Sequence, residues 1–129
     1  FDSVLDFIHN GGKYLGICVG MQILFRSSEE GLKQGFGFFN HRIKLLNPES
    51  HLTHIGWEYV HFANQNIPTK FYFLHKYCFK PETFDSDLGI AEYPVKFCAT
   101  IQKRNITASQ FHPEKSGNNG LEFLQHCLG

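Results

Sequence analysis

A cysteine between two glycines is the first feature of this sequence that points to chemistry. Cys18 lies between Gly16 and Gly20, directly after an apolar run that ends at Ile17. Small neighbours permit a strained corner between a strand and a helix, and such corners expose the nucleophile of many hydrolases. The N–H groups at a helix start would also favour the thiolate. The alternative is a buried, unreactive cysteine on a glycine-rich turn, and this segment alone leaves both readings open.

A histidine and a carboxylate far downstream are the groups that a cysteine nucleophile needs. His112, Pro113 and Glu114 follow the strand-like run 106–110. A thiol nucleophile needs a base that accepts its proton, and the base needs a carboxylate that fixes its tautomer. Pro113 holds the chain extended, so the two flanking side chains can point to the same side. A lone His-Pro-Glu is usually a loop, but together with the cysteine corner it predicts a Cys-His-Glu triad.

The hydrophobic pattern predicts the elements that must position these groups, in the order of an α/β domain. A short helix ends at 11–12, a buried strand covers 13–18, and a helix begins over 20–25. Five short strands and a final amphipathic helix follow, at 42–46, 57–62, 71–74, 95–100, 106–110 and 120–128. Turn-forming residues separate them at 47–48, 64–68 and 81–88. We expect one domain over 1–129, with parallel core strands from both ends of the chain and an antiparallel excursion between them.

Composition excludes several classes of protein. The chain has 129 residues, of which 42% are hydrophobic, which is enough for a packed core. Lys plus Arg and Asp plus Glu each total 12, so the formal charge is zero, which argues against nucleic acid or an anionic membrane as the partner. No apolar run is long enough to span a membrane. The cysteines are far apart and form no Cys-x-x-Cys pair, which is typical of free thiols in a reducing, cytoplasmic compartment.

Histidine and cysteine spacing also raises the possibility of a metal site. His75-x-x-Cys78 and His51-x-x-His54 have ligand-like spacing, but neither has a matching second pair. We therefore expect no metal and no organic cofactor. The cysteines other than Cys18 lie in apolar runs and are expected to be small core residues, namely Cys78, Cys98 and Cys127.

Several segments, taken in order, resemble the class I (triad) glutamine amidotransferases. The resemblance is carried by 16–22, Gly-Ile-Cys-Val-Gly-Met-Gln, and by 110–117, Gln-Phe-His-Pro-Glu-Lys-Ser-Gly. The further strings at 25–30, 54–57 and 71–75 make the sequence most similar to the glutaminase subunits of imidazole glycerol phosphate synthases. The resemblance implies an α/β, flavodoxin-like fold in which helices flank a mixed sheet. It also implies that the family's N-terminal part precedes the matched region, so the domain is expected to be truncated at its N-terminus.

The same resemblance implies an activity and a partner. The protein would hydrolyse L-glutamine to glutamate and ammonia and pass the ammonia to a synthase or cyclase subunit, in a heterodimer of histidine biosynthesis. Cys18 would form a γ-glutamyl thioester, His112 would act as acid and base, and Glu114 would orient His112. A turn at Gly56 and Trp57 would face the partner subunit.

Substrate contacts follow from the resemblance as well. Gln22 and Glu30 would hold the α-amino and α-carboxylate groups of glutamine, and the Val19 N–H would donate to the oxyanion. The segment with Lys76 and Tyr77 would close over the substrate.

Two departures from the family pattern leave alternatives open. The glycine-rich loop that supplies the second oxyanion donor is expected in the missing N-terminal part, which favours an inactive interaction module as a rival. Lys76 stands where relatives have a small hydroxyl residue, which favours an amidotransferase subunit of a sugar-modifying synthase. A hydrolase of γ-glutamyl peptides is a third alternative. Gln22 and Glu30 disfavour it, because they suit a free amino acid.

Overall fold

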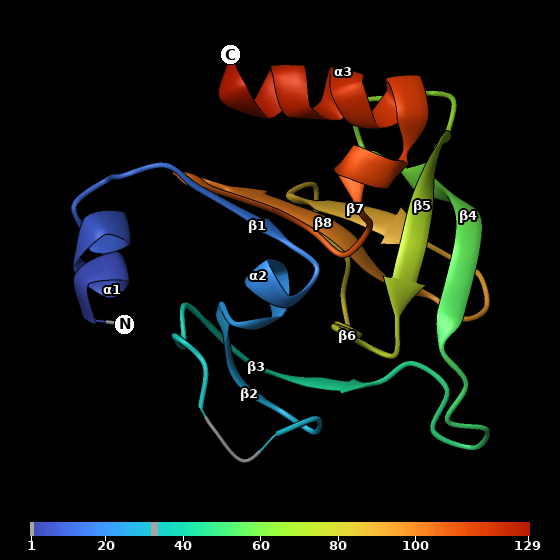
Figure 1. Ribbon diagram of the computed structural model, residues 1–129, viewed down its shortest axis with the longest axis horizontal. Coiled ribbons are helices and arrows are strands. Elements are labelled where there is room, and N and C mark those ends of the chain that lie inside the picture. The colour runs from blue at the N-terminus through green and yellow to red at the C-terminus, as the bar shows by residue number, and fades with distance from the viewer. Residues whose placement is uncertain (1, 32–33) are drawn as a thin grey trace.

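The larger of two β-sheets combines strands from both ends and from the middle of the chain (Figure 1). The computed structural model describes residues 2–31 and 34–129. In the six-stranded sheet the order is β1 (Tyr14–Ile17), β9 (Ile106–Ser109), β8 (Phe97–Lys103), β7 (Leu88–Ala91), β4 (His54–His61) and β5 (Thr69–His75). β1 and β9 are parallel and the other neighbours are antiparallel. The expected antiparallel excursion between parallel strands is thus confirmed.

A smaller sheet and the helices cover the two faces of the larger sheet. The smaller sheet has the order β2 (Phe25–Ser28), β3 (Phe39–Leu45) and β6 (Tyr77–Cys78). The helical segments are α1 (Asp2–His9), α2 (Val19–Gln22), the 3₁₀ turn η1 (Pro113–Lys115) and α3 (Gly117–Leu128). Figure 1 shows α3 on one side of the larger sheet, and α2 with the smaller sheet on the other. None of the helices in the described part of the chain is long and apolar enough to cross a membrane.

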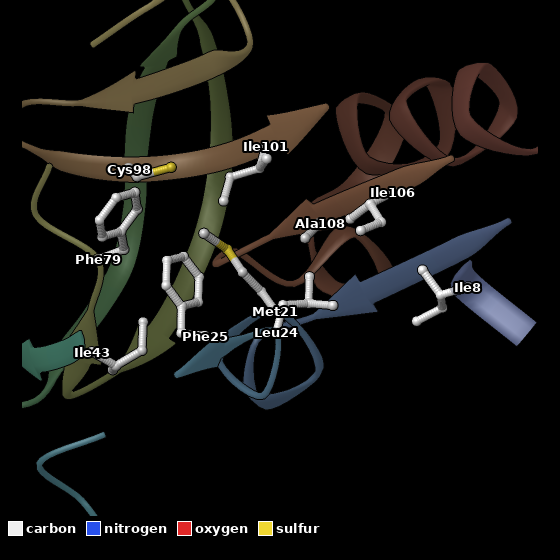
Figure 2. Close-up of a cluster of buried hydrophobic side chains, with 10 residues drawn as sticks. All are labelled: Ile8, Met21, Leu24, Phe25, Ile43, Phe79, Cys98, Ile101, Ile106 and Ala108. Carbon is white, nitrogen blue, oxygen red and sulfur yellow. The ribbon is translucent and has the colours of Figure 1, made fainter. Parts of the chain in front are cut away.

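Each face of the larger sheet has its own hydrophobic core, because successive side chains of a strand point to opposite faces. On β8, Cys98 packs in one core, and Phe97 and Ala99 pack in the other. Figure 2 shows the first core, in which residues of α2 and β2 pack beneath β8 and β9; its buried members are Ile8, Met21, Leu24, Phe25, Ile43, Phe79, Cys98, Ile101, Ile106 and Ala108. The second core includes Phe123 of α3 and the stacked pair Phe71 and Phe111.

The predicted helix over 20–25 is wrong in extent. α2 ends at Gln22 and β2 begins at Phe25. The backbone carbonyls after the helix accept hydrogen bonds from the segment 36–39, namely Ile23 from Phe36, Leu24 from Phe39 and Phe25 from Gly37. These nonlocal bonds, together with the full burial of Leu24 and Phe25, outweigh the helical preference of the segment.

β7 was not predicted, because its first residue ends the range 81–88 that reads as a turn. The strand has four residues and contains Gly89, so it lacks a clear alternation of polar and apolar residues. The Gly89 N–H donates to Thr100 Oγ1 at 3.0 Å, and a side chain at this position would collide with that hydroxyl. Pairing with β8 therefore specifies this strand. The expected core positions of Cys78 and Cys98 are confirmed, and Cys127 is half-buried.

Candidate active site

The corner between β1 and α2 holds Cys18 in a strained conformation. Cys18 has φ 55° and ψ −105°, a backbone conformation that residues with side chains rarely adopt. Its N–H donates to the Ser109 carbonyl at 2.7 Å, which continues the pairing of β1 with β9. A Cβ atom at Gly16 would lie 2.4 Å from the Gly20 carbonyl oxygen, so the corner closes only because residue 16 has no side chain. The strained corner predicted from the glycine spacing is present.

The Cys18 sulfur lies between two polar groups from distant parts of the chain. Its thiol donates to the Leu74 carbonyl at 3.8 Å and accepts from Gln110 Nε2 at 3.6 Å. Burial raises the pKa of the Cys18 thiol, and the nearby carboxylates of Glu30 and Glu114 raise it further; the Val19 N–H and the Gln110 amide lower it. The thiolate is therefore not favoured overall, contrary to the expectation from the helix start. α2 has a single turn, and burial outweighs its N–H groups.

A raised thiol pKa means that Cys18 needs a base, and the His-Pro-Glu segment holds one in a fixed orientation. His112 follows β9, and its Nδ1 lies 2.9 Å from Glu114 Oε2. Burial is the largest single influence on Glu114 and raises its pKa, but the hydrogen bond to His112, a backbone hydrogen bond and the charges of His112 and Lys115 together lower it, and the net shift is downward. With Nδ1 bonded to the carboxylate, Nε2 is the ring nitrogen left for proton transfer. The predicted His112–Glu114 pair is formed.

One edge of β5 bonds to both Cys18 and His112. The Leu74 carbonyl meets the Cys18 thiol, and the Tyr72 carbonyl accepts from the His112 N–H at 2.9 Å. Carbonyls two residues apart point to the same edge of a strand, and β5 pairs with β4 through its other edge. Ser116 fixes this geometry, since its hydroxyl accepts from the Tyr72 N–H at 2.9 Å and donates to the His112 carbonyl at 2.6 Å. Nothing in the sequence pattern indicated Tyr72, Leu74 or Ser116, because they act through their backbone or through long-range contacts.

The side-chain amide nitrogen of Gln22 is bonded to other groups of the protein. Its side chain is buried, and Nε2 donates to the Tyr77 carbonyl at 3.0 Å and to Gln110 Oε1 at 3.1 Å. Both hydrogens of this nitrogen are thus used within the protein, so the Gln22 amide nitrogen supports the wall of the site instead of facing a substrate. The role expected of Gln22 at the head group of glutamine stays a prediction, and these bonds assign the amide nitrogen to the protein.

The other residues expected to contact the substrate are Val19, Glu30, Lys76 and Tyr77. Val19 follows it directly and is exposed. Glu30 is exposed in the turn after β2, and its charge acts on the Cys18 thiol. Lys76 lies between β5 and β6, and Tyr77 begins β6. The Lys76 carbonyl accepts from the Leu46 N–H at 2.9 Å, and the Tyr77 ring packs against the first core. These two residues therefore have backbone contacts that hold the segment in place beside Gln22.

Two buried histidines beside this segment were not recognised as a pair from the sequence. His54 Nδ1 lies 2.9 Å from His75 Nε2, and His75 Nδ1 lies 3.1 Å from the Tyr77 carbonyl. They occupy directly opposite positions on β4 and β5. Burial lowers the pKa of both rings, that of His75 to about 4. The contact between His54 and His75 follows from the register of β4 and β5, and the spacing of histidines along the sequence does not indicate it. In the described segments no group of three His, Cys, Asp or Glu side chains could hold a metal ion.

The buried His75 ring predicts a loss of stability in mild acid. Its folded-state pKa is below that of an unfolded histidine, so the unfolded chain binds more protons between about pH 6.5 and pH 4. The free energy of unfolding should therefore fall through this window, by about 3 kcal/mol at its lower end. Urea unfolding of the full-length protein at several pH values measures this slope. The variant His75→Asn, whose amide can donate to the Tyr77 carbonyl, should flatten it. His126→Asn, at an exposed histidine, should leave it unchanged; an identical slope in His75→Asn would contradict the prediction.

The expected turn at Gly56 and Trp57 is wrong, because both residues lie inside β4. Gly56 has φ 132°, which favours glycine and lets the strand bend there. On the outer face of β4, Ile55, Trp57 and Tyr59 are 62%, 48% and 45% exposed. Their cross-strand partners on β5 are Leu74, Tyr72 and Lys70. We call these six residues the β4–β5 stripe.

Comparison with known proteins places this geometry in a family. The model of the glutamine amidotransferase class-I family matches residues 3–128, and the chain belongs to that family. The chain is 39% identical to the imidazole glycerol phosphate synthase subunit HisH of Neisseria meningitidis serogroup A, over 98% of this chain and 66% of that protein. It is 40% identical to the HisH subunit of Picrophilus torridus, over 97% of this chain and 68% of that protein. The chain thus spans about two thirds of the length of these relatives.

A solved structure supports the fold independently of sequence. The crystal structure of a glutamine amidotransferase superposes with a TM-score of 0.66 at 15% identity, over 99% of this chain and 68% of that one. The α/β fold expected from the resemblance, a mixed sheet flanked by helices, is confirmed.

Proposed function

We propose that this chain carries the glutaminase site of an imidazole glycerol phosphate synthase, releasing ammonia from L-glutamine for a synthase or cyclase subunit. The observation that carries the proposal is the edge of β5, where the Leu74 carbonyl accepts from the Cys18 thiol and the Tyr72 carbonyl accepts from the His112 N–H. His112 is already oriented by Glu114 at 2.9 Å. The HisH relatives support the choice of subunit.

The chemistry begins with proton transfer. His112 accepts the thiol proton of Cys18, and the thiolate attacks the side-chain amide carbon of glutamine. The Val19 N–H donates to the oxyanion that forms. His112 then gives the proton to the leaving nitrogen, the C–N bond breaks, and ammonia departs, leaving a γ-glutamyl thioester on Cys18. Water activated by His112 hydrolyses the thioester to glutamate. The cycle uses no metal or organic cofactor.

We assign the two charged ends of a free amino acid to Glu30 and Lys76. The Glu30 carboxylate is close enough to act on the thiol, and it is the proposed partner of the α-amino group. Lys76, in the segment between β5 and β6, is the proposed partner of the α-carboxylate. A γ-glutamyl peptide has a bulky amide substituent but the same head group, so direct comparison of glutamine with such a peptide separates the two substrate classes. A cytoplasmic location fits this metabolite and the free thiols.

The experiment that tests the function measures glutamate release from L-glutamine by the full-length protein, alone and with the cyclase subunit. Release that the partner stimulates supports the proposal. A folded protein that binds the partner without releasing glutamate would instead establish the non-catalytic interaction module. Preference for γ-glutamyl peptides over glutamine would establish the third alternative.

The β4–β5 stripe is the proposed docking surface for the cyclase subunit. Large exposed aromatic residues are typical centres of protein interfaces, and Trp57 lies in the middle of the stripe with its ring centroid 6.0 Å from that of Tyr72. Trp57→Ala should weaken binding of the partner by about 30-fold or more. Isothermal titration with the partner measures this. Leu121→Ala, at an exposed apolar residue on α3, is the matched control and should bind normally; equal affinity of both variants would rule out the stripe.

A further inference from the structure

A continuous chain of hydrogen bonds runs from β4 to the Cys18 sulfur. His54 Nδ1 lies 2.9 Å from His75 Nε2, and His75 Nδ1 lies 3.1 Å from the Tyr77 carbonyl oxygen. The same carbonyl accepts from Gln22 Nε2 at 3.0 Å. Gln22 Nε2 also donates to Gln110 Oε1 at 3.1 Å, and Gln110 Nε2 donates to Cys18 Sγ at 3.6 Å. The chain thereby joins β4, β5, β6 and α2 to the residues that directly follow β1 and β9, Cys18 and Gln110.

The Tyr77 carbonyl determines the direction of every bond in this chain. A carbonyl oxygen can only accept, so Gln22 must turn its nitrogen toward it. The second hydrogen of that nitrogen then requires an acceptor, and Gln110 presents Oε1 to it. The Gln110 amide nitrogen is left facing the sulfur. The other lone pair of the carbonyl accepts from His75 Nδ1, which makes His75 Nε2 the acceptor for His54. The amide of Gln110 is therefore held in one of its two orientations by groups that do not touch Cys18.

We propose that Gln110 is a positioning residue, which holds the Cys18 sulfur and stabilises its thiolate through the Nε2–H donor. This inference rests on the proposed function, in which Cys18 is the nucleophile. Gln110 is 0% exposed, and a buried amide is costly unless its groups are bonded. Its backbone N–H donates to the Ala99 carbonyl at 2.8 Å, so its side chain is not needed to attach the strand end to β8. A leucine would fill the same space without the donor.

Groups around Cys18 shift the pKa of its thiol in both directions, and the Gln110 amide is one of the two that lower it. The carboxylates of Glu30 and Glu114 and the burial of the site all raise the pKa of Cys18. The Val19 N–H and the Gln110 amide lower it. The backbone donor is part of the corner itself, so Gln110 is the side chain whose replacement removes a stabilising contact from the thiolate while leaving the corner closed.

The test compares the pH dependence of Cys18 alkylation in the full-length protein and in Gln110→Leu. Iodoacetamide reacts with the thiolate, and mass spectrometry of the peptide that contains Cys18 separates it from Cys127. The midpoint in Gln110→Leu should rise by about one pH unit, which is about tenfold less thiolate near neutral pH. The acid limb of kcat/KM should move by the same amount.

A matched control separates positioning from general stability. Thr100→Val removes a buried hydroxyl that accepts from the Gly89 N–H on the neighbouring strand and takes no part in the hydrogen bonds that lead from His54 to Cys18. It should lower the melting temperature without moving the alkylation midpoint. An unchanged midpoint in folded Gln110→Leu would overturn the proposal, whether or not the protein releases glutamate. Absence of glutamate release by the unmodified protein would instead overturn the proposed function. The two outcomes are distinguishable because alkylation of Cys18 does not require turnover.

A second measurement on the unmodified sequence applies if Gln110→Leu fails to fold. The side-chain amide of Gln110 should give nitrogen and proton NMR resonances that shift with the titration of Cys18. The shift should vanish in Cys18→Ala. Amide resonances that do not follow the thiol would overturn the proposal.

Discussion

Replacement of Cys18 by alanine is expected to abolish the release of glutamate from L-glutamine. The nucleophile and its base act as a unit, so removing the nucleophile costs about as much as removing both, on the order of 10⁶-fold in kcat. Alanine removes the atom that forms the thioester, while the β1–α2 corner retains its backbone bonds to Ser109 and within α2. Glutamate should be measured by a coupled assay at saturating glutamine, with the cyclase subunit present.

The other cysteines provide the matched control for this result. Cys127 is half-buried on α3, far from the corner in the fold, and Cys127→Ala should retain full activity. Cys78 and Cys98 are buried, and burial holds their thiol pKa values far above neutral, that of Cys78 at about 12. Their thiols are therefore unreactive at neutral pH. Full activity of Cys18→Ala would refute the mechanism.

His112→Asn is expected to have an effect of similar size, a fall in kcat on the order of 10⁶-fold, because the base acts as a unit with the nucleophile. An asparagine side chain can occupy the space of the imidazole ring beside Glu114, but it cannot accept the thiol proton. The backbone bond from residue 112 to the Tyr72 carbonyl does not involve the side chain, so β5 and η1 should stay in place. The measurement is kcat for glutamate release, with thermal unfolding as the check on the fold.

Partial restoration of His112→Asn separates a missing base from a damaged site. Added imidazole should recover part of the activity by accepting the thiol proton in place of the missing ring, and a rise in pH should do so by increasing the thiolate fraction of Cys18. Cys18→Ala should show no such recovery. Activity of His112→Asn close to that of the unmodified protein would exclude His112 as the base.

Much of the site could be predicted from the sequence because its chemistry sits in two short local segments. The glycines at 16 and 20 required a tight corner, and the corner closes as that spacing demands. His112 and Glu114 are two residues apart, so their contact depends on local backbone alone. The parallel pairing of β1 and β9 could also be predicted, since both runs are apolar and lead into the two chemical segments.

The remaining features depend on contacts between distant parts of the chain. The orientation of the Gln22 amide is set by the Tyr77 carbonyl, 55 positions away, which no local pattern indicates. The His54–His75 pair exists only through the register of β4 and β5. Trp57 was placed in a turn because a glycine precedes it, whereas Gly56 serves to bend a strand. In each case a tertiary contact overrides the local signal.

The most direct test of the account is intact-mass spectrometry of the full-length protein after treatment with a diazo-ketone analogue of glutamine. Such a reagent alkylates a thiolate that lies beside a bound glutamine side chain. We predict one adduct per chain, located on Cys18 by peptide mapping and prevented by excess L-glutamine. A folded protein that takes up no reagent, or takes it up on another cysteine without protection by glutamine, would contradict the assignment of Cys18 as the glutaminase nucleophile.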